Sequence, residues 1–464
     1  MAGTRILAAV SGAVALAASL IYTLTVTRRL PTQDLALLTL YNSAYAVATA
    51  VVGYATTWYP RVLAKDPSRL PELAAAGILV ALAAAIPLAA YLALYGRLDP
   101  VLLALGATSL VLFAWPAGAY IAVYRQRLSV AANFASQLVK IGGAYAVRQS
   151  PTAYVAIAVT ALMLLPAAVA KRAKPNFRRA IPTVVAFLRG APYQTLFLAT
   201  TAAGGLVTYA ILLAGGDKLL SYNFILFQIS KSVYPALAIV PLMYGSLLTE
   251  KDKTRRALID GAVLLYLYLL AAAVMAKTPQ WYIALLRPTE LNSELIEAVR
   301  LNAAALVASG IYLHADTTLK GLTEKEIFSL KDPPAKALLL DLVTAPINTA
   351  LTYALAKSLG APGMVLAQLI ILATIASYRI QLLGVHAKQL ITQLYLPSAI
   401  TLIAIYLTPM PLFPFASKNL IDTITTYIPN LVILALVAGG YMLALSRSAR
   451  EAATTLLRKA TRQI

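Results

Sequence analysis

The stretch that decides the fold is LAAAGILVALAAAIPLAAYLAL, residues Leu73 to Leu94, which contains no charged side chain. It is long enough to cross a bilayer as a helix, since a spanning helix takes about 20 apolar residues. A second run, AVLLYLYLLAAAVM at Ala262 to Met275, is equally continuous. A spanning β-strand would alternate polar and apolar residues, and neither stretch does so. The pattern predicts an all-α integral membrane protein.

Apolar runs of this kind fill the rest of the chain. Of its 464 residues, 60% are hydrophobic and 12% are charged, against about 25% charged residues in soluble domains, so no sizeable soluble domain fits between the runs. The runs predict about 14 transmembrane helices, at roughly 6–27, 35–59, 73–95, 100–124, 128–147, 152–170, 190–215, 219–248, 257–276, 294–315, 337–356, 362–384, 392–408 and 424–446. The absence of Cys and the presence of only two His exclude thiol catalysis, disulfide bonds, thiolate metal sites and a histidine-rich metal centre.

The 39 Lys and Arg residues, which give a net charge of +21, predict the orientation in the membrane. Basic residues collect in cytoplasmic loops, and a cytoplasmic N-terminus puts about two thirds of them on that side. An even number of spans returns the basic C-terminal tail to the cytoplasm as well. The first apolar run continues into Arg28 and Arg29 without a clear cleavage site, so we expect a retained helix rather than a signal peptide. The predicted location is the plasma membrane, with both termini cytoplasmic.

The most basic loop, KRAKPNFRR at Lys171 to Arg179, follows the sixth span. Six spans, a basic linker and six more spans are the arrangement expected of two related bundles around a central cavity. The predicted parts are an N-terminal six-helix lobe at 1–170, a basic cytoplasmic linker at 171–189, a C-terminal six-helix lobe at 190–388, two additional transmembrane helices at 389–446 and a basic cytoplasmic tail at 447–464. We expect the tail to form an amphipathic helix, with Ala452, Leu456, Leu457 and Ala460 on its apolar side.

Two stretches at the ends of spans have a distinctive order of residues. RRLPTQDLA, at Arg28 to Ala36, follows the first span with an arginine, apolar residues, a small turn and the acidic residue Asp34. The eighth span opens with Tyr222 and reaches Pro241 before an acidic turn.

A third stretch is VTAPINTALTYALAKSLGAPGMVLAQL, at Val343 to Leu369, with Asn348 inside one span and Gly360 and Gly363 in the turn to the next. Together the three stretches resemble the multidrug, oligosaccharidyl-lipid and polysaccharide (MOP) exporter superfamily, and within it the polysaccharide-type flippases. In this resemblance Arg28 stands at the family arginine, whereas Ala36 replaces the usual glycine.

The resemblance implies a transporter that works by alternating access, not an enzyme, and no catalytic residue is expected. The implied activity is translocation of an anionic lipid-linked oligosaccharide, a polyprenyl phosphate or diphosphate sugar, from the cytoplasmic to the outer leaflet for polysaccharide or glycoprotein biosynthesis. The alternative is a cation-coupled multidrug exporter of the same superfamily. The multidrug exporters of this superfamily place an acidic residue inside the first helix. This chain has no carboxylate there before Asp34, which counts against the alternative. The expected partners are the lipid-linked oligosaccharide and membrane lipids, without nucleic acid, and we expect a monomer.

Basic side chains within or at the edges of the spans favour an anionic substrate. Ionisable residues at membrane depth cost about 2.5 to 3.5 kcal/mol each on insertion scales and mark a transport pathway. The candidate substrate-binding residues are Arg28, Arg29, Asn133, Gln137, Lys140 and Lys231. Spacings of four and three residues place Asn133, Gln137 and Lys140 on one face of the fifth span.

Each candidate also has a purely structural interpretation. The side chains of Arg28 and Arg29 can extend to lipid headgroups, and Lys231 can pair with an acidic residue of another helix. For Arg379, near the cytoplasmic end of its span, contact with headgroups is the expectation.

Oxygen-bearing side chains form a stripe on the eleventh span. Asp341, Thr344, Asn348 and Thr352 recur at helical spacing, and hard oxygen ligands suit alkali or alkaline-earth ions. Asp341, Thr344 and Asn348 are therefore the candidate site for a monovalent cation, and coupling to Na⁺ or H⁺ is a hypothesis; no other cofactor is expected. The alternative is that Asp341 interacts with the helix dipole while Thr344 and Asn348 serve helix packing.

Overall fold

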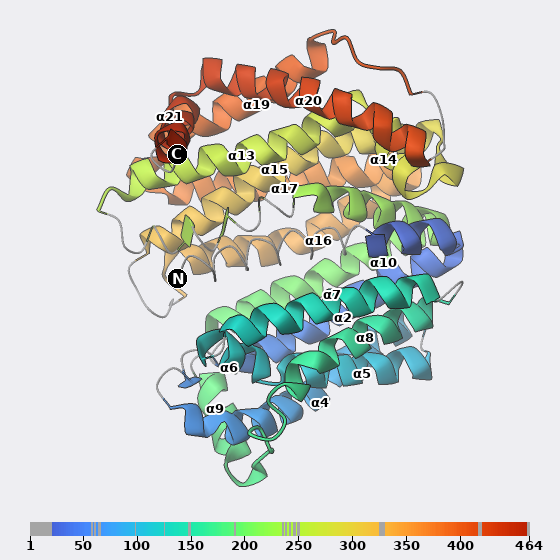
Figure 1. Ribbon diagram of the computed structural model, residues 1–464, viewed down its shortest axis with the longest axis vertical. Helices are drawn as coiled ribbons and strands as arrows, with labels where there is room; N and C mark the ends of the chain where they lie inside the picture. The colour runs from blue at the N-terminus through green and yellow to red at the C-terminus, as the bar shows by residue number, and fades with distance from the viewer. Residues whose placement is uncertain are drawn as a thin grey trace. The chain divides into compact units, whose positions relative to one another are not determined.

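A computed structural model describes residues 21–56, 59, 62–63, 66–97, 99–124, 126–146, 150–189, 192–233, 236, 239–240, 243–244, 247, 251–323, 330–415 and 420–461. Within these ranges every regular element is helical, and no residue lies in a β-strand (Figure 1). The chain is therefore an all-α membrane protein, as its continuous apolar runs predict.

Ten helical stretches in the described part of the chain are long and apolar enough to cross a membrane. The helices that form them are α2 (Thr32–Thr56), α4 (Leu70–Leu94), α5 (Pro100–Ala114) with α6 (Ala117–Tyr124), α10 (Pro192–Ser230), α13 (Lys253–Lys277), α15 (Ser293–Leu322), α16 (Pro333–Leu359), α17 (Ala361–Leu382), α18 (Ala387–Leu390) with α19 (Leu396–Leu407), and α20 (Leu420–Leu445). The predicted fifth and sixth spans are the helices α7 (Gln126–Ala146) and α8 (Pro151–Ala167). Most of the predicted first span, 6–27, lies outside the described residues.

Polar residues in the loops set where several of these helices begin. The Asp99 carboxylate accepts hydrogen bonds from the backbone N–H groups of Val101 and Leu102 at the start of α5. Ser150 and Asn292 cap α8 and α15 in the same way. These side chains satisfy N–H groups that have no partner within the helix, so the loops between spans can be short.

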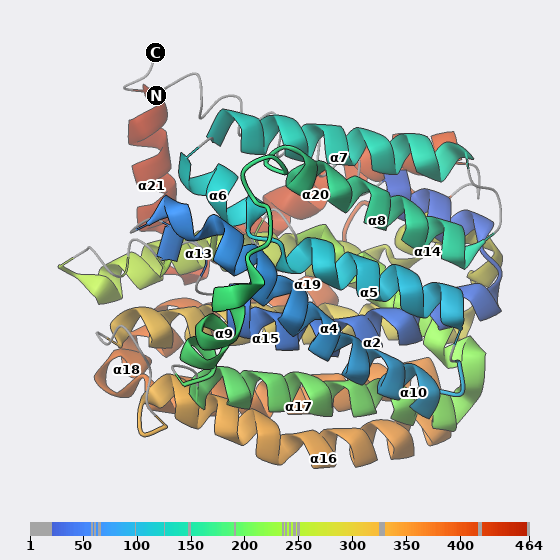
Figure 2. The same cartoon turned by 90° about the horizontal axis from the view of Figure 1, so that it is seen from below.

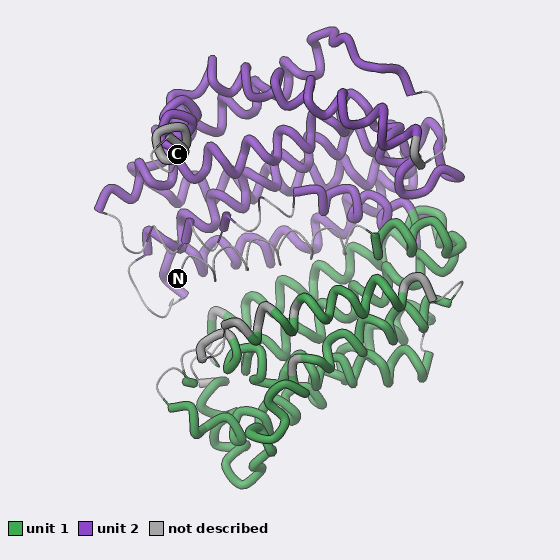
Figure 3. The backbone as a smooth tube through the Cα atoms, in the orientation of Figure 1, with its two compact units in different colours: residues 1–212, 216–221 green, residues 213–215, 222–464 purple. Residues whose placement is uncertain are grey.

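The chain divides into two compact units, coloured separately in Figure 3. Unit 1 contains residues 1–212 and 216–221, and unit 2 contains residues 213–215 and 222–464. The division falls within α10, where Gly216 has a φ of 60°, a left-handed conformation that interrupts a regular helix. A continuous helix of the 39 residues of α10 would be about 60 Å long, roughly twice the hydrocarbon thickness. The interruption lies where the sequence predicts the connection between the seventh and eighth spans. The lobe limits given above, 1–170 and 190–388, stay a prediction.

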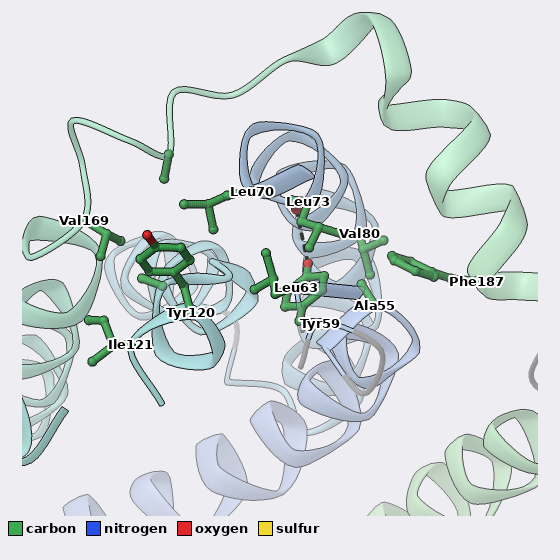
Figure 4. Packing of buried hydrophobic residues seen from close by; sticks show 12 residues of the cluster. Ala55, Tyr59, Leu63, Leu70, Leu73, Val80, Tyr120, Ile121, Val169 and Phe187 are labelled. Atoms are coloured by element: carbon green, nitrogen blue, oxygen red, sulfur yellow. Dashed lines mark hydrogen bonds between the residues drawn. The ribbon is translucent and has the colours of Figure 1, made fainter. Parts of the chain in front are cut away.

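Unit 1 is a series of neighbouring helices in the order α7, α8, α5, α4 and α2 (Figure 2). Its buried cluster, drawn in Figure 4, consists of Ala55, Tyr59, Leu63, Leu70, Leu73, Val80, Ala117, Tyr120, Ile121, Val169, Ala173 and Phe187. The Tyr59 hydroxyl donates a hydrogen bond to the Leu73 carbonyl oxygen at 3.3 Å, which ties the end of the second span to the start of the third.

The basic linker between the sixth and seventh spans is folded against unit 1. Its elements are the 3-10 turn η2 (Phe177–Arg179) and the short helix α9 (Ala180–Arg189), which packs on α4. The backbone N–H of Asn176 donates to the Pro71 carbonyl oxygen at 2.9 Å, and Arg179 forms an ion pair with Glu72 at 3.2 Å. The segment 171–189 is thus a fixed part of this unit and not an open connection.

Unit 2 has α16, α17, α15 and α13 as successive neighbours, followed by α19 and α20 (Figure 1). The C-terminal helix α21 (Arg447–Thr461) packs on α13, and Arg255 of α13 forms an ion pair with Glu451 of α21. Ala452 is 4% exposed, as expected for the apolar face of the predicted amphipathic tail. The side chains of Leu456, Leu457 and Ala460 lie outside the described residues.

The turn between α16 and α17 contains both glycines of the third family-like stretch. Gly360 has φ 66° and ψ −140°, a combination that residues with a Cβ rarely adopt. The next N–H group, of Ala361, donates to Glu294 Oε1 at 3.1 Å, and a Cβ on Gly360 would overlap that oxygen. At Gly363, a Cβ would overlap the Leu355 carbonyl oxygen. Both positions therefore require glycine for a tight turn between the two helices.

We expect Gly360→Ala to destabilise unit 2 by about 1–3 kcal/mol, because the backbone would be strained and Glu294 displaced. Thermal unfolding of the purified protein in detergent measures the effect as a lower Tm. Gly440→Ala is the matched control, since a Cβ there meets no atom within 4 Å and alanine is favoured over glycine inside a helix. Equal Tm values for the two variants would contradict the role assigned to this turn.

Candidate functional site

The two arginines after the first span lie in unit 1 beside α8. Residues 21–29 are helical, and Arg28 and Arg29 are half-buried at the end of this segment. The Arg29 side chain hydrogen-bonds the hydroxyl of Tyr154, while the Tyr22 hydroxyl donates to the Tyr154 carbonyl oxygen at 2.9 Å. Arg29 is therefore held against α8. The rings of Tyr22 and Tyr154 also pack edge to face, with 5.9 Å between their centroids, so the helical segment 21–29 contacts α8 at Tyr154 through both residues.

The polar stripe predicted on the fifth span lies on α7. Gln137 and Lys140 are half-buried, whereas Phe134 and Leu138 on another face are 40% and 51% exposed; the side chain of Asn133 lies outside the described residues. An exposed apolar face is suited to lipid, so the polar stripe lies beside the lipid-facing surface and not on it.

Lys231 lies in unit 2, in the 3-10 turn η3 (Lys231–Val233) that follows α10. Its ammonium group stands 4.8 Å from the centroid of the Phe227 ring, a cation–π contact. The candidate cations are thus divided between the units, with Arg28, Arg29 and Lys140 in unit 1 and Lys231 in unit 2. Their assignment to one substrate site stays a prediction.

The family-like tyrosine of the eighth span has a structural partner. Tyr222 is 1% exposed; its hydroxyl accepts a hydrogen bond from Asn292 Nδ2 at 2.8 Å and donates to Glu290 Oε2 at 3.5 Å. It connects α10 to the cap of α15. Pro241, the other residue of that pattern, lies outside the described residues.

Unit 2 contains a buried ionic network that the sequence did not predict. Arg379 of α17 has no exposed side-chain surface, so the expectation that it contacts lipid headgroups is wrong. Its guanidinium donates from Nη1 and Nη2 to the two carboxylate oxygens of Asp341 of α16, at 2.8 and 2.6 Å, and from Nε to Asp316 Oδ1 of α15 at 3.1 Å. This is the two-pronged geometry for which an arginine side chain is suited.

Two further groups complete the network. Lys320 Nζ lies 2.6 Å from Asp316 Oδ2, one turn along the same helix. The Tyr312 ring lies under the guanidinium, 4.3 Å from its centroid, and its hydroxyl accepts from Arg379 Nη2 at 3.3 Å. Two cations thus balance two carboxylates, so the network introduces no net charge while joining three helices. Such compensation is what makes ionised groups tolerable away from water.

The order of the spans along the chain already indicated that these three charged residues lie on the same side of the membrane. Asp316 lies in the last turns of α15, Asp341 in the first turns of α16 and Arg379 in the last turn of α17. Consecutive antiparallel spans bring these helix ends to one side of the membrane. The tenth span was predicted to end before Asp316, and Arg379 was assigned to lipid headgroups, so the two residues were not predicted to meet.

The predicted cation site at Asp341, Thr344 and Asn348 can be compared with this geometry. Both carboxylate oxygens of Asp341 are bound by Arg379, and the Thr344 hydroxyl donates to the Leu340 carbonyl oxygen at 2.9 Å. The Thr352 hydroxyl donates to Asn348 Oδ1 at 3.3 Å. No cluster of three or more His, Cys, Asp or Glu that could bind a metal ion occurs among the residues described. A cation at Asp341 would therefore compete with the guanidinium, and the site stays a prediction.

We expect Asn348→Ala to remove any dependence of transport on Na⁺ if the stripe binds that ion, because Asn348 supplies an oxygen without taking part in the Arg379 network. Transport by reconstituted protein, measured with Na⁺ and with an equal concentration of choline, tests this. Thr349→Ala is the control on the same helix, since its hydroxyl donates to the Ala345 carbonyl oxygen. A Na⁺ dependence that survives in Asn348→Ala would remove the stripe from consideration.

The chain can now be compared with known proteins. No family model matches the sequence, and no curated protein matches it. Among solved structures, it is similar to the lipid II flippase MurJ in an inward closed conformation, with a TM-score of 0.64, 12% sequence identity, and coverage of 94% of this chain and 98% of that chain.

Two transporter structures are also similar. One is an inward-facing multidrug resistance MATE family transporter of the MOP superfamily, with a TM-score of 0.58, 12% identity, and coverage of 85% of this chain and 96% of that chain. The other is a MATE mutant, with a TM-score of 0.54, 14% identity, and coverage of 87% and 97%. The protein has the fold of the transporters and flippases of the MOP superfamily, as the sequence resemblance predicts.

Proposed function

We propose that the protein is a flippase that moves an anionic lipid-linked oligosaccharide from the cytoplasmic to the outer leaflet by alternating access. The substrate headgroup would be a polyprenyl phosphate or diphosphate sugar, destined for polysaccharide or glycoprotein biosynthesis. The protein would act in the plasma membrane as a monomer, with both termini in the cytoplasm. The fold supports a transport function; the substrate class rests on the charges described next.

The observation that carries the proposal is the balance of charge inside the spans. In unit 2, the carboxylates of Asp316 and Asp341 are paired with Arg379 and Lys320. In unit 1, Lys140 is half-buried within α7, whereas Arg28 is half-buried at the end of the helical residues 21–29 and the described carboxylates, such as Asp34, also lie near helix ends. A lobe with cations at membrane depth attracts phosphate, because charge-assisted hydrogen bonds to phosphate are strong and ionisable residues at that depth mark pathways.

The alternative is a cation-coupled multidrug exporter. The similarity to two MATE structures favours it. An exporter of organic cations would use carboxylates that are free to exchange their partner for a proton, a metal ion or the drug. The pairing of Asp316 and Asp341 with basic side chains is the feature that makes this alternative the weaker one.

The experiment is reconstitution into sealed liposomes that contain a fluorescent polyprenyl-diphosphate oligosaccharide. A membrane-impermeant quencher reports the outer-leaflet fraction, with and without an imposed membrane potential, because basic groups in the pathway respond to potential. We expect protein-dependent movement of the diphosphate lipid and none of a cationic dye. Dye efflux driven by a Na⁺ or H⁺ gradient, with the lipid left in place, would establish the multidrug alternative instead.

A further inference from the structure

Unit 1 contains an apolar groove between α2, α4, α9 and the first turns of α10, with a volume of about 450 Å³. The groove is lined chiefly by aliphatic side chains, among them Val51, Ala83, Val184 and Leu198. Its volume falls within the range of roughly 300–1,000 Å³ that is usual for ligand pockets. Phe187 of α9, which Figure 4 shows directed at Val80 and Ala55, forms part of the same wall.

The helix α9 contributes exposed apolar side chains to the wall of this groove. Ile181 is 67% exposed and Val185 38% exposed, and Phe177 in the preceding turn is 54% exposed, whereas Phe187 on the opposite face is 8% exposed and packs against the core. A short helix with apolar residues on both sides is unfavourable in water. It is stable at a membrane interface, where its exposed apolar side chains are buried at the boundary between the lipid headgroups and the acyl chains.

Basic side chains precede this apolar face. Lys171, Lys174 and Arg178 are exposed in the segment that leads into α9, and Arg178 stands three positions before Ile181, which places both on one side of the chain. The segment is anchored, because Arg172 Nη1 donates to the Tyr120 hydroxyl at 3.0 Å. Cations in the segment that leads into the groove-lining helix α9 complement a ligand with an anionic head and a hydrocarbon tail.

We infer that the groove binds an acyl chain of an anionic glycerophospholipid, whose headgroup lies on the basic segment 171–179. Anionic lipids are abundant in the cytoplasmic leaflet, the side on which the positive-inside rule places this segment. The bound lipid fills the groove between α9 and the spans of unit 1, so it holds α9 against the lobe. None of Arg28, Lys140 and Lys231 lines the groove, and the inference does not depend on the transported substrate.

The test measures lipid retained by the purified full-length protein after exchange in mixed micelles of equal phosphatidylglycerol and phosphatidylcholine, by native mass spectrometry. We expect phosphatidylglycerol to be retained in preference. Ala83→Trp fills the groove and should abolish that preference, whereas Ile86→Trp, on the same helix at a position 71% exposed and outside the groove, should keep it. Phosphatidylglycerol should also raise the Tm of the wild type and of Ile86→Trp, but not of Ala83→Trp.

Charge is tested separately, so that the inference does not rest on one bulky substitution. Arg178→Gln removes a cation near the membrane surface and should weaken phosphatidylglycerol binding about fivefold while leaving phosphatidylcholine unchanged. Lys388→Gln, which removes an exposed cation from unit 2, should have no such effect. Equal retention of the two lipids, or a preference that Ala83→Trp leaves intact, would overturn the inference. Displacement of phosphatidylglycerol by undecaprenyl phosphate would also overturn it and assign the groove to the tail of the transported lipid.

Discussion

We expect the replacement of Arg379 by Leu to lower the stability of unit 2 by about 3–5 kcal/mol, because it would leave Asp341 buried without its counter-charge. Asp341 is 8% exposed and receives two of the guanidinium hydrogen bonds. Asp316 is affected less, since Lys320 still pairs with it. Thermal unfolding in detergent should show a Tm lower by about 5 °C or more, accompanied by earlier proteolysis within unit 2.

The double variant Arg379→Leu with Asp341→Asn distinguishes two causes of lost stability, namely the lost packing of the Arg379 side chain and the unpaired buried charge of Asp341. It removes one cation and one anion, and the remaining pair of Asp316 and Lys320 is balanced, so we expect it to be more stable than Arg379→Leu alone. Arg300→Leu is the matched control, because Arg300 is exposed on α15 and its loss should change Tm by a few tenths of a degree to about one degree. If the double variant is no more stable than the single one, the carboxylate of Asp341 is not the source of the cost.

If the proposed function is right, replacing Lys140 by Ala should reduce transport of a diphosphate-linked lipid by about tenfold or more, while the Tm should stay within a degree or two of the wild type. A hydrogen bond between a charged donor and phosphate is worth about 1.5–3 kcal/mol, and roughly 1.4 kcal/mol corresponds to a factor of ten. Lys140 is half-buried on a different face of α7 from the exposed Phe134 and Leu138. Arg28→Ala should act in the same direction.

Two comparisons make the Lys140 prediction specific. Lys140→Arg keeps the charge and should retain much of the activity, whereas Lys388→Ala removes an exposed lysine of unit 2 and should retain all of it. Flipping is followed with the quencher assay in the same liposomes, with protein orientation checked by protease accessibility. Full activity of both Lys140→Ala and Arg28→Ala would refute a cationic substrate path in unit 1.

Much of the fold could be predicted from local sequence. The described parts of the spans from 35–59 onward are largely helical, because a continuous apolar run in a bilayer must satisfy its backbone hydrogen bonds within itself, and a helix does so. The apolar runs placed the connection between the seventh and eighth spans between 215 and 219, and Gly216, with a φ of 60°, lies there within α10. Gly360 and Gly363 in the turn after α16 were singled out by the family resemblance, and Gly360 has a backbone conformation that few residues can adopt.

The sequence by itself determined the helical membrane fold, the apolar face of the tail at Ala452 and the excess of basic residues in the spans. Each of these depends on the identity of neighbouring residues and on the bilayer, which acts on every helix alike. Only the tertiary structure decided the partner of each charge. Arg379 contacts Asp316 and Asp341 at sequence separations of 63 and 38 residues, and Arg29 reaches Tyr154. An ion pair forms where two helices meet, and helical periodicity within one span carries no information about which residues of another span it will face.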